Sequence, residues 1–169
     1  VGAKILISGG GRCNYTNLYS SAANFISQNE HFCKSAFSQW TVDDTIAFFE
    51  TYGIQGQEKT LGQLFPISNK AKDIIKIFEN LCDDLDQTIY CNAEVKAIMK
   101  LTNDHFQISY ARKDQINTLE VPKVVIACGG LPIPKMGASD FALKIARQFG
   151  LQIAETAPAL VPLTITGKD

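Results

Sequence analysis

The spacing of apolar residues predicts two amphipathic helices followed by an antiparallel sheet. Apolar side chains recur every three or four positions in residues 41–53 and in residues 68–85, which is typical of helices with one buried face. Thr41 and Asp44 form a capping-box pattern at the start of the first of these helices. From residue 88 to residue 121 the period changes to two, and clusters of polar residues separate the alternating runs. This stretch predicts a strand followed by an antiparallel meander.

Two continuous apolar runs end in consecutive glycines, and each predicts a strand buried on both faces. Residues 1–7 lead into the three glycines at positions 9–11, and residues 123–128 lead into the pair at 129–130. A strand without alternation is typical of a parallel sheet that helices cover on both sides. We therefore expect both runs to belong to the main sheet.

The remaining segments carry weaker patterns. Residues 18–40 are polar with scattered aromatic side chains and predict one or two short helices, whereas residues 53–68 predict two short strands or a flap. Ser139 or Asp140 begins a last helix, which Gly150 ends. Two further segments are expected to be extended: a final strand over residues 151–155 and the proline-containing residues 157–163.

Taken in order, these elements form an α/β pattern with an inserted antiparallel β-meander. The first β-α-β unit of a doubly wound sheet is missing from the pattern, so we expect a fragment of such a domain. The sequence has no internal repeat and no low-complexity tract.

Composition narrows the function classes. The chain has 169 residues, is 46% hydrophobic and carries a net charge of −1, which suits one globular domain. A charge so close to zero gives no long-range attraction to nucleic acid or to an anionic membrane. No apolar run approaches the ~18–20 residues that a membrane span needs, and no secretion signal is visible.

Cysteine and histidine usage argues against a disulfide framework and against a metal site. The five cysteines are odd in number and form no C-x-x-C pair, and His31 and His105 lie far apart in the sequence. A reducing, cytoplasmic setting is therefore the expectation.

The two glycine loops are the candidate chemistry. Backbone N–H groups at consecutive glycines can form an anion-binding concavity, and ligands of open α/β sheets bind beyond the carboxyl ends of the strands. Two such loops at one edge suggest a long ligand such as a dinucleotide, with Arg12 paired to a phosphate. The alternative is that Gly9 to Gly11 form a tight turn and that residues 14–17 cap a helix. Two known phosphate-binding patterns, the P-loop and G-x-G-x-x-G, do not occur in the sequence. Hydrogen bonds to a ligand are expected from Ser8, Asn14, Thr16 and Asn17.

Residues 4–17, KILISGGGRCNYTN, resemble the diagnostic segment of the BaiN/YhiN-type family of bacterial flavoproteins, which are NAD(P)/FAD-dependent oxidoreductases. Five more segments match the family in the same order: residues 61–68, 93–98, 124–130, 134–150 and 158–163. The resemblance implies a Rossmann-like FAD-binding domain over residues 1–163, without its N-terminal fingerprint unit and its returning C-terminal segment. Residues 164–169 would begin the linker to an inserted domain.

The resemblance also implies the cofactor and its contacts. FAD would meet the first glycine loop through its flavin and phosphates, the backbone of Val95 through its adenine, and the second glycine loop at close range. NADH or NADPH would supply electrons. The candidate cofactor-binding residues are Ser8, Gly9, Gly10, Gly11, Arg12, Cys13, Asn14, Thr16, Asn17, Val95, Ala127, Cys128, Gly129 and Gly130.

Three positions depart from the family pattern. Gln63 stands where an arginine is usual, Cys128 replaces a threonine, and Leu131 begins a divergent run. These changes leave FAD binding expected and leave open whether activity is retained. Cys13 is either a structural residue of the motif or a redox partner of the flavin, although no second cysteine stands at a redox spacing.

We expect the intact protein to be a flavoenzyme that transfers hydride between a reduced nicotinamide or a substrate and FAD. Its expected partner is a small-molecule substrate, with no nucleic acid and no membrane. The alternative is a degenerate or truncated flavin fold that binds a nucleotide or a partner protein without turnover. A flavin enzyme acting on RNA is a third possibility, which the near-neutral charge disfavours.

Overall fold

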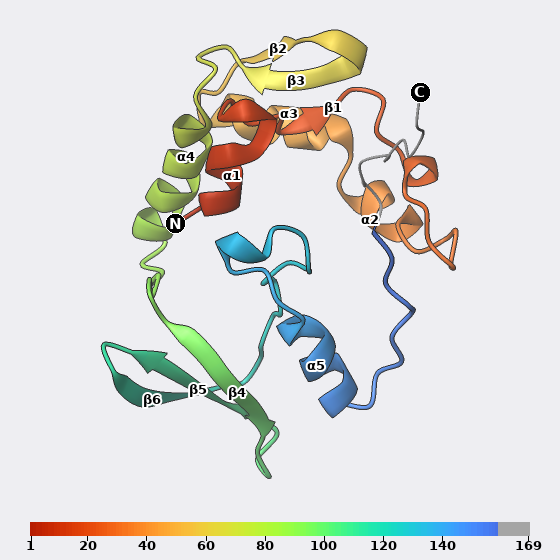
Figure 1. Cartoon of the computed structure of the whole chain (residues 1–169). Coiled ribbons are helices and arrows are strands. Elements are labelled where there is room, and N and C mark those ends of the chain that lie inside the picture. Colours follow the sequence, from red (N-terminus) through yellow and green to blue (C-terminus); the bar gives the residue numbers. More distant parts are fainter. Residues whose placement is uncertain (159–169) are drawn as a thin grey trace, which may run out of the picture. The chain divides into compact units, whose positions relative to one another are not determined.

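The computed structural model describes residues 1–158, which divide into a first unit ending at Val124 and a second beginning at Val125 (Figure 1). The extended segment expected at 157–163 and the domain boundary expected at 163 fall wholly or partly outside the described residues. Among the described residues, no helix is long and apolar enough to cross a membrane.

The first unit contains two amphipathic helices close to their expected positions. Helix α3 (Val42–Thr51) begins with the expected capping box: the Thr41 hydroxyl accepts from the Asp44 amide at 3.1 Å, and the Asp44 carboxylate accepts from the Thr41 amide at 2.8 Å. The Thr41 hydroxyl also donates to the Asp44 carboxylate at 2.7 Å, and this bond, followed by the one from the Thr41 amide, holds the pKa of Asp44 below its usual range. Helix α4 (Ala71–Asp84) begins three residues after Ser68.

Two three-stranded antiparallel sheets accompany these helices. One has the order β1 (Thr16–Asn17), β3 (Gln63–Pro66), β2 (Gly56–Glu58), and so confirms two short strands between residues 53 and 68. The other is the expected meander, β4 (Glu94–Lys100), β5 (Phe106–Arg112) and β6 (Gln115–Val121). The strand expected at 88–91 does not form, since β4 begins only at Glu94.

Short helical elements complete the chain. Within residues 18–40 lie the 3₁₀ turn η2 (Ala22–Asn24) and helix α2 (Lys34–Gln39), as expected. The second unit contains η4 (Pro134–Met136) and helix α5 (Phe141–Gln148), which begins directly after Asp140.

Three further strand predictions are wrong. Residues 3–7 form helix α1 (Ala3–Ile7), and residues 123–128 and 151–155 have no regular structure. A short apolar run does not by itself distinguish a strand from a helix. A strand also needs a neighbour for its backbone groups, and both sheets of the described residues are antiparallel and leave these segments unpaired. Val125 is accordingly 86% exposed.

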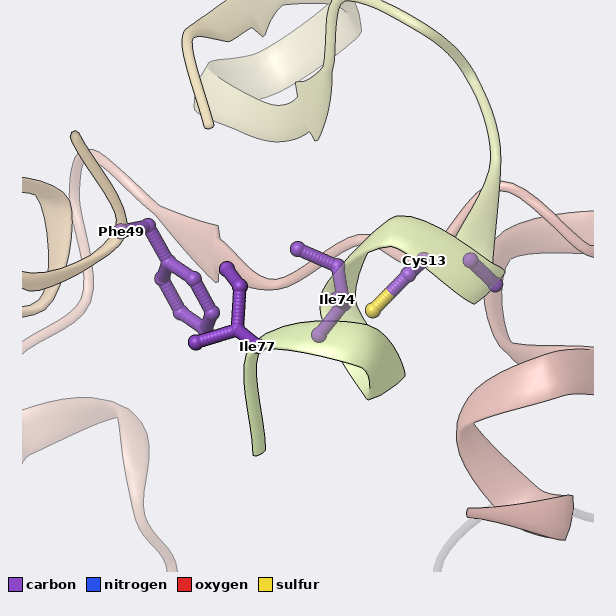
Figure 2. Close-up of a cluster of buried hydrophobic side chains, with 5 residues drawn as sticks. Cys13, Phe49, Ile74 and Ile77 are labelled. Atoms are coloured by element: carbon purple, nitrogen blue, oxygen red, sulfur yellow. The ribbon is translucent and has the colours of Figure 1, made fainter. Parts of the chain in front are cut away.

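A small apolar core fixes helix α4 beneath the loop that follows α1 (Figure 2). Phe49 of α3, Ile74 and Ile77 of α4, and Cys13 of the loop are all buried and pack together. Ile5 of α1 packs against this cluster, which is why its apolar run favours a helix here. The core thereby sets the position of the glycine loop.

Candidate functional site

Three consecutive glycines bend the chain sharply after helix α1. Gly9, Gly10 and Gly11 have φ values of 54°, 67° and 82°, a left-handed conformation that other residues rarely adopt. The carbonyl oxygen of Ser8 accepts hydrogen bonds from the amides of Gly11 and Cys13, both at 3.0 Å. Because all three glycines are exposed, the turn presents bare backbone at the surface.

The two sides of this loop differ in the room that they leave for a ligand. A Cβ atom at Gly9 would lie 2.7 Å from Cε1 of Phe65 and 2.9 Å from the amide nitrogen of Asn14. At Gly10 the nearest atom would be a guanidinium nitrogen at 3.8 Å, and at Gly11 a carbonyl oxygen at 3.6 Å. Packing against Phe65 and Asn14 closes the Gly9 side of the loop, whereas the backbone at Gly10 and Gly11 is open to the close approach of a ligand. The loop therefore leaves room for a ligand to approach the backbone at Gly10 and Gly11, and contact with FAD stays a prediction.

Polar side chains of the loop mostly hold the loop itself. The Ser8 hydroxyl donates to a carbonyl of helix α1 at 2.8 Å, and the Asn17 amide donates to a carbonyl just before β3 at 2.8 Å. The Asn14 amide, oriented to satisfy its neighbours, donates to the carbonyls of Leu64 and Thr16 at 3.1 and 2.8 Å. These bonds support the loop, and direct contact of these side chains with a cofactor stays a prediction.

Arg12 is the exposed charged residue of the loop. Its Nε donates to the carbonyl of Gly9 at 2.8 Å, and its guanidinium carbon lies 5.2 Å from the centre of the Phe65 ring. The side chain is thereby held beside the loop, and a guanidinium has further N–H donors for an anion.

A cavity of about 350 Å³ opens beside the loop in the first unit. Its walls are largely apolar, and Lys4 is the charged residue among them. Three of the expected site residues, Ser8, Cys13 and Asn14, line this cavity together with residues of the core. The lining comprises Lys4, Ile5, Ser8, Cys13, Asn14, Tyr15, Phe49, Ile74 and Phe78.

Tyr15 is a residue of this region that the sequence analysis missed. Its ring lies 4.8 Å from that of Phe49, and its buried hydroxyl has no hydrogen-bond partner among the described residues. Burial, and to a smaller extent the charge of Glu50, raises the pKa of Tyr15. Nothing in the local pattern indicates this placement, because it depends on the bond from the Tyr15 amide to the Leu64 carbonyl.

Cys13 is a core residue. It is 6% exposed and packs with Phe49 and Ile74, and it is a free thiol like the other four cysteines (Figure 2). A buried thiol among apolar side chains is typically unreactive. This environment favours the structural role over the redox role.

We expect Cys13 of the folded intact protein to react with a maleimide at least about tenfold more slowly than Cys91, because Cys13 is 6% exposed and packed among apolar side chains whereas Cys91 is exposed. Mass spectrometry of peptides after timed labelling gives both rates, and labelling in urea is the control for intrinsic reactivity. Equal rates in the folded protein would contradict the packing described here.

The other expected contact residues belong to other segments of the chain. Val95 is in edge strand β4, next to a register shift between Val95 and Ala97. Ala127 to Gly130 are irregular and exposed, and they belong to the second unit. The structure therefore gathers the residues between Ser8 and Asn17, while the expected convergence of the two glycine loops stays a prediction.

Comparison with known proteins gives a family match along almost the whole chain. The model described as "HI0933-like protein Rossmann domain" matches residues 1–167. A ribosomal RNA dihydrouridine synthase of Escherichia coli is 42% identical over 97% of this chain and 40% of its own length. A protein of the same name from Haemophilus influenzae is 36% identical over 100% of this chain and 42% of its own length.

A more distant relative is a 3-dehydro-bile acid delta(4,6)-reductase of Clostridium scindens, 28% identical over 98% of this chain and 39% of its own length. The chain thus spans about two fifths of the length of these curated relatives. The match confirms the Rossmann-like α/β fold class and the relation to FAD-binding flavoproteins of the BaiN/YhiN type.

Proposed function

The chain belongs to the HI0933-like family, and we propose that the intact protein is an FAD-dependent oxidoreductase that reduces a carbon–carbon double bond conjugated to a carbonyl group. The observation that carries this proposal is the family match over residues 1–167, together with the names of three relatives. The family is FAD-binding.

The relatives' names share one kind of reaction. Forming dihydrouridine saturates the C5–C6 bond of uracil, which is conjugated to the C4 carbonyl. A delta(4,6)-reductase of a 3-dehydro-bile acid likewise acts on double bonds conjugated to a ketone. In both cases the carbonyl draws electrons from the double bond, so that one hydride and one proton add across it. We therefore propose this reaction class ahead of any single substrate.

The residues of this chain would bind and orient the cofactor. Gly10 and Gly11 leave room for its close approach, Arg12 offers guanidinium donors to a phosphate, and the largely apolar cavity walls offer a surface for an aromatic ring. When bound, FAD supplies the hydride chemistry, with NADH or NADPH proposed as the electron source.

Uracil in RNA is the first substrate class to test, because two relatives above 30% identity are named ribosomal RNA dihydrouridine synthase. The small-molecule substrate expected of a flavoenzyme remains the second candidate, and the name of the bile acid reductase favours it.

The test uses the intact protein. Cofactor released by heat from one sample is identified by its absorption spectrum and by chromatography. A separate native sample is reduced anaerobically with NADPH or NADH. Oxidation by a uridine-containing RNA, with dihydrouridine detected by mass spectrometry, is the expected result, and a steroid enone is the comparison substrate. A colourless protein that takes up no added FAD would contradict the proposal and favour the alternative binding module.

A further inference from the structure

Two cationic side chains of the first unit converge on a single aromatic ring. The Lys59 ammonium lies 4.6 Å from the centre of the Phe65 ring, and the Arg12 guanidinium carbon lies 5.2 Å from it. The two charges are therefore no farther apart than about one Debye length of 10 Å, so each raises the positive potential at the other.

Both cations are held by neutral groups. The Lys59 ammonium donates to Oδ1 of Asn69 at 2.6 Å, and Arg12 donates to the carbonyl of Gly9 at 2.8 Å. Neither cation has a carboxylate within ion-pair distance among the residues that the structure describes. Their positive charge is thus left for a ligand.

The nearest acidic residue in the sequence does not neutralise Lys59. Glu58 pairs with Leu64 across strands β2 and β3, while the neighbouring Gln57 pairs with Phe65. Because successive side chains of a strand point to opposite faces, Glu58 lies on the face away from Phe65. The Lys59 amide donates to the carbonyl of Gln63 at 2.8 Å, which fixes the end of this hairpin.

The floor beneath the two cations is rigid. Phe65 is 3% exposed, and the bare backbone of Gly9 lies against its ring edge. Asn69 has a φ of 54° and donates to the carbonyl of Ile67 at 3.1 Å, so the acceptor of Lys59 is itself fixed. Segments far apart in the sequence thereby hold two positive charges against one ring, and Arg12 also lies beside the open backbone of Gly10.

We propose that Arg12 and Lys59 together form a binding site for a phosphate group. A guanidinium and an ammonium are both charge-assisted donors to phosphate oxygens, and here they lie 5.2 Å and 4.6 Å from the centre of one ring. The phosphate belongs either to the dinucleotide cofactor or to an RNA substrate, and the RNA source rests on the proposed function. Lys59 is a positioning and binding residue here, with no part in the hydride chemistry.

Substitutions in the intact protein distinguish the two sources. Lys59→Met keeps the aliphatic stem over Phe65 and removes the charge, Lys59→Arg restores a charge, and Lys34→Met in helix α2 is the control for charge loss alone. We expect Lys59→Met to weaken either FAD binding to the apoprotein or binding of a fluorescent single-stranded oligoribonucleotide by about tenfold. Lys59→Arg is expected to restore most of that affinity.

Salt dependence identifies the RNA source. If the ligand is RNA, the logarithmic slope of its affinity against salt falls by about 0.7 in Lys59→Met, while FAD binding is unchanged. If the ligand is FAD, the pattern reverses. Unchanged affinity for both ligands, in a variant with wild-type thermal stability, would overturn the proposal.

A measurement on the wild-type protein covers the case in which Lys59→Met does not fold. Acetic anhydride modifies exposed lysines, and inorganic pyrophosphate is expected to protect Lys59 at least threefold more than Lys34. Equal protection of both lysines would overturn the phosphate site. The experiments above measure ligand binding and protection from modification, which do not depend on catalysis. An intact protein that reduces no conjugated double bond would therefore contradict the proposed function, and the test of the phosphate site would still give a result.

Discussion

Replacing Gly9 with alanine is expected to destabilise the intact protein by about 2–5 kcal/mol and to abolish FAD retention. The new Cβ would lie 2.7 Å from the Phe65 ring and 2.9 Å from the Asn14 amide nitrogen, and neither the buried ring nor the backbone can move aside cheaply. Overpacking costs about 1–3 kcal/mol, and a left-handed φ of 54° costs an L-residue about 1–2 kcal/mol more.

Gly10→Ala is the matched control for this substitution. Gly10 has a similar φ of 67°, but its added Cβ would meet only the Arg12 guanidinium at 3.8 Å. It therefore shares the backbone cost and lacks the overpacking. Urea unfolding followed by far-ultraviolet circular dichroism gives both losses of stability, and released flavin gives cofactor content. Equal destabilisation by the two variants would show that the Gly9 side of the loop is not packed against Phe65.

The sequence predicted the elements whose formation depends on neighbouring residues. The capping box of Thr41 and Asp44 and the helical spacing after Ser68 act within a few residues, and both helices form. The alternation in residues 94–121 likewise gives a meander, because consecutive strands pair with one another. Local physical chemistry is sufficient for these parts.

Elements that need a distant partner were not predictable in the same way. Residues 1–7 and 123–128 are apolar enough for buried strands, but an apolar run does not specify its neighbour. Among the described residues, Ile5 packs against the core as part of a helix, whereas the segment around Val125 pairs with no strand and Val125 is exposed.

The same distinction between local and distant interactions applies to the candidate site. Three consecutive glycines predicted bare backbone, and all three adopt the left-handed conformation. The ring beneath them did not follow from the motif, because Phe65 reaches Arg12 through the pairing of β3 with β1, and Lys59 reaches Phe65 through the pairing of β2 with β3. Cys13 belongs to the motif by sequence and to the core by structure.

Ile74→Ala is expected to destabilise the intact protein by about 2–5 kcal/mol, because it removes a fully buried side chain where the surroundings can collapse only in part. Ile74 is 2% exposed, packs with Cys13 and Phe49, and lines the cavity beside the glycine loop. Its loss would therefore loosen the support of the loop as well as the core, and we expect FAD to be lost at a lower urea concentration than in the wild type.

Ile26→Ala removes the same atoms from a side chain that is 100% exposed, so its expected effect is within about 0.5 kcal/mol. Both variants make the same chemical substitution, so the difference between their losses of stability gives the contribution of burial. Urea midpoints from circular dichroism and from flavin release would shift together for Ile74→Ala if helix α4 supports the cofactor loop. A shift in the unfolding midpoint alone would mean that the loop keeps its ligand without α4, and would separate the core from the candidate site.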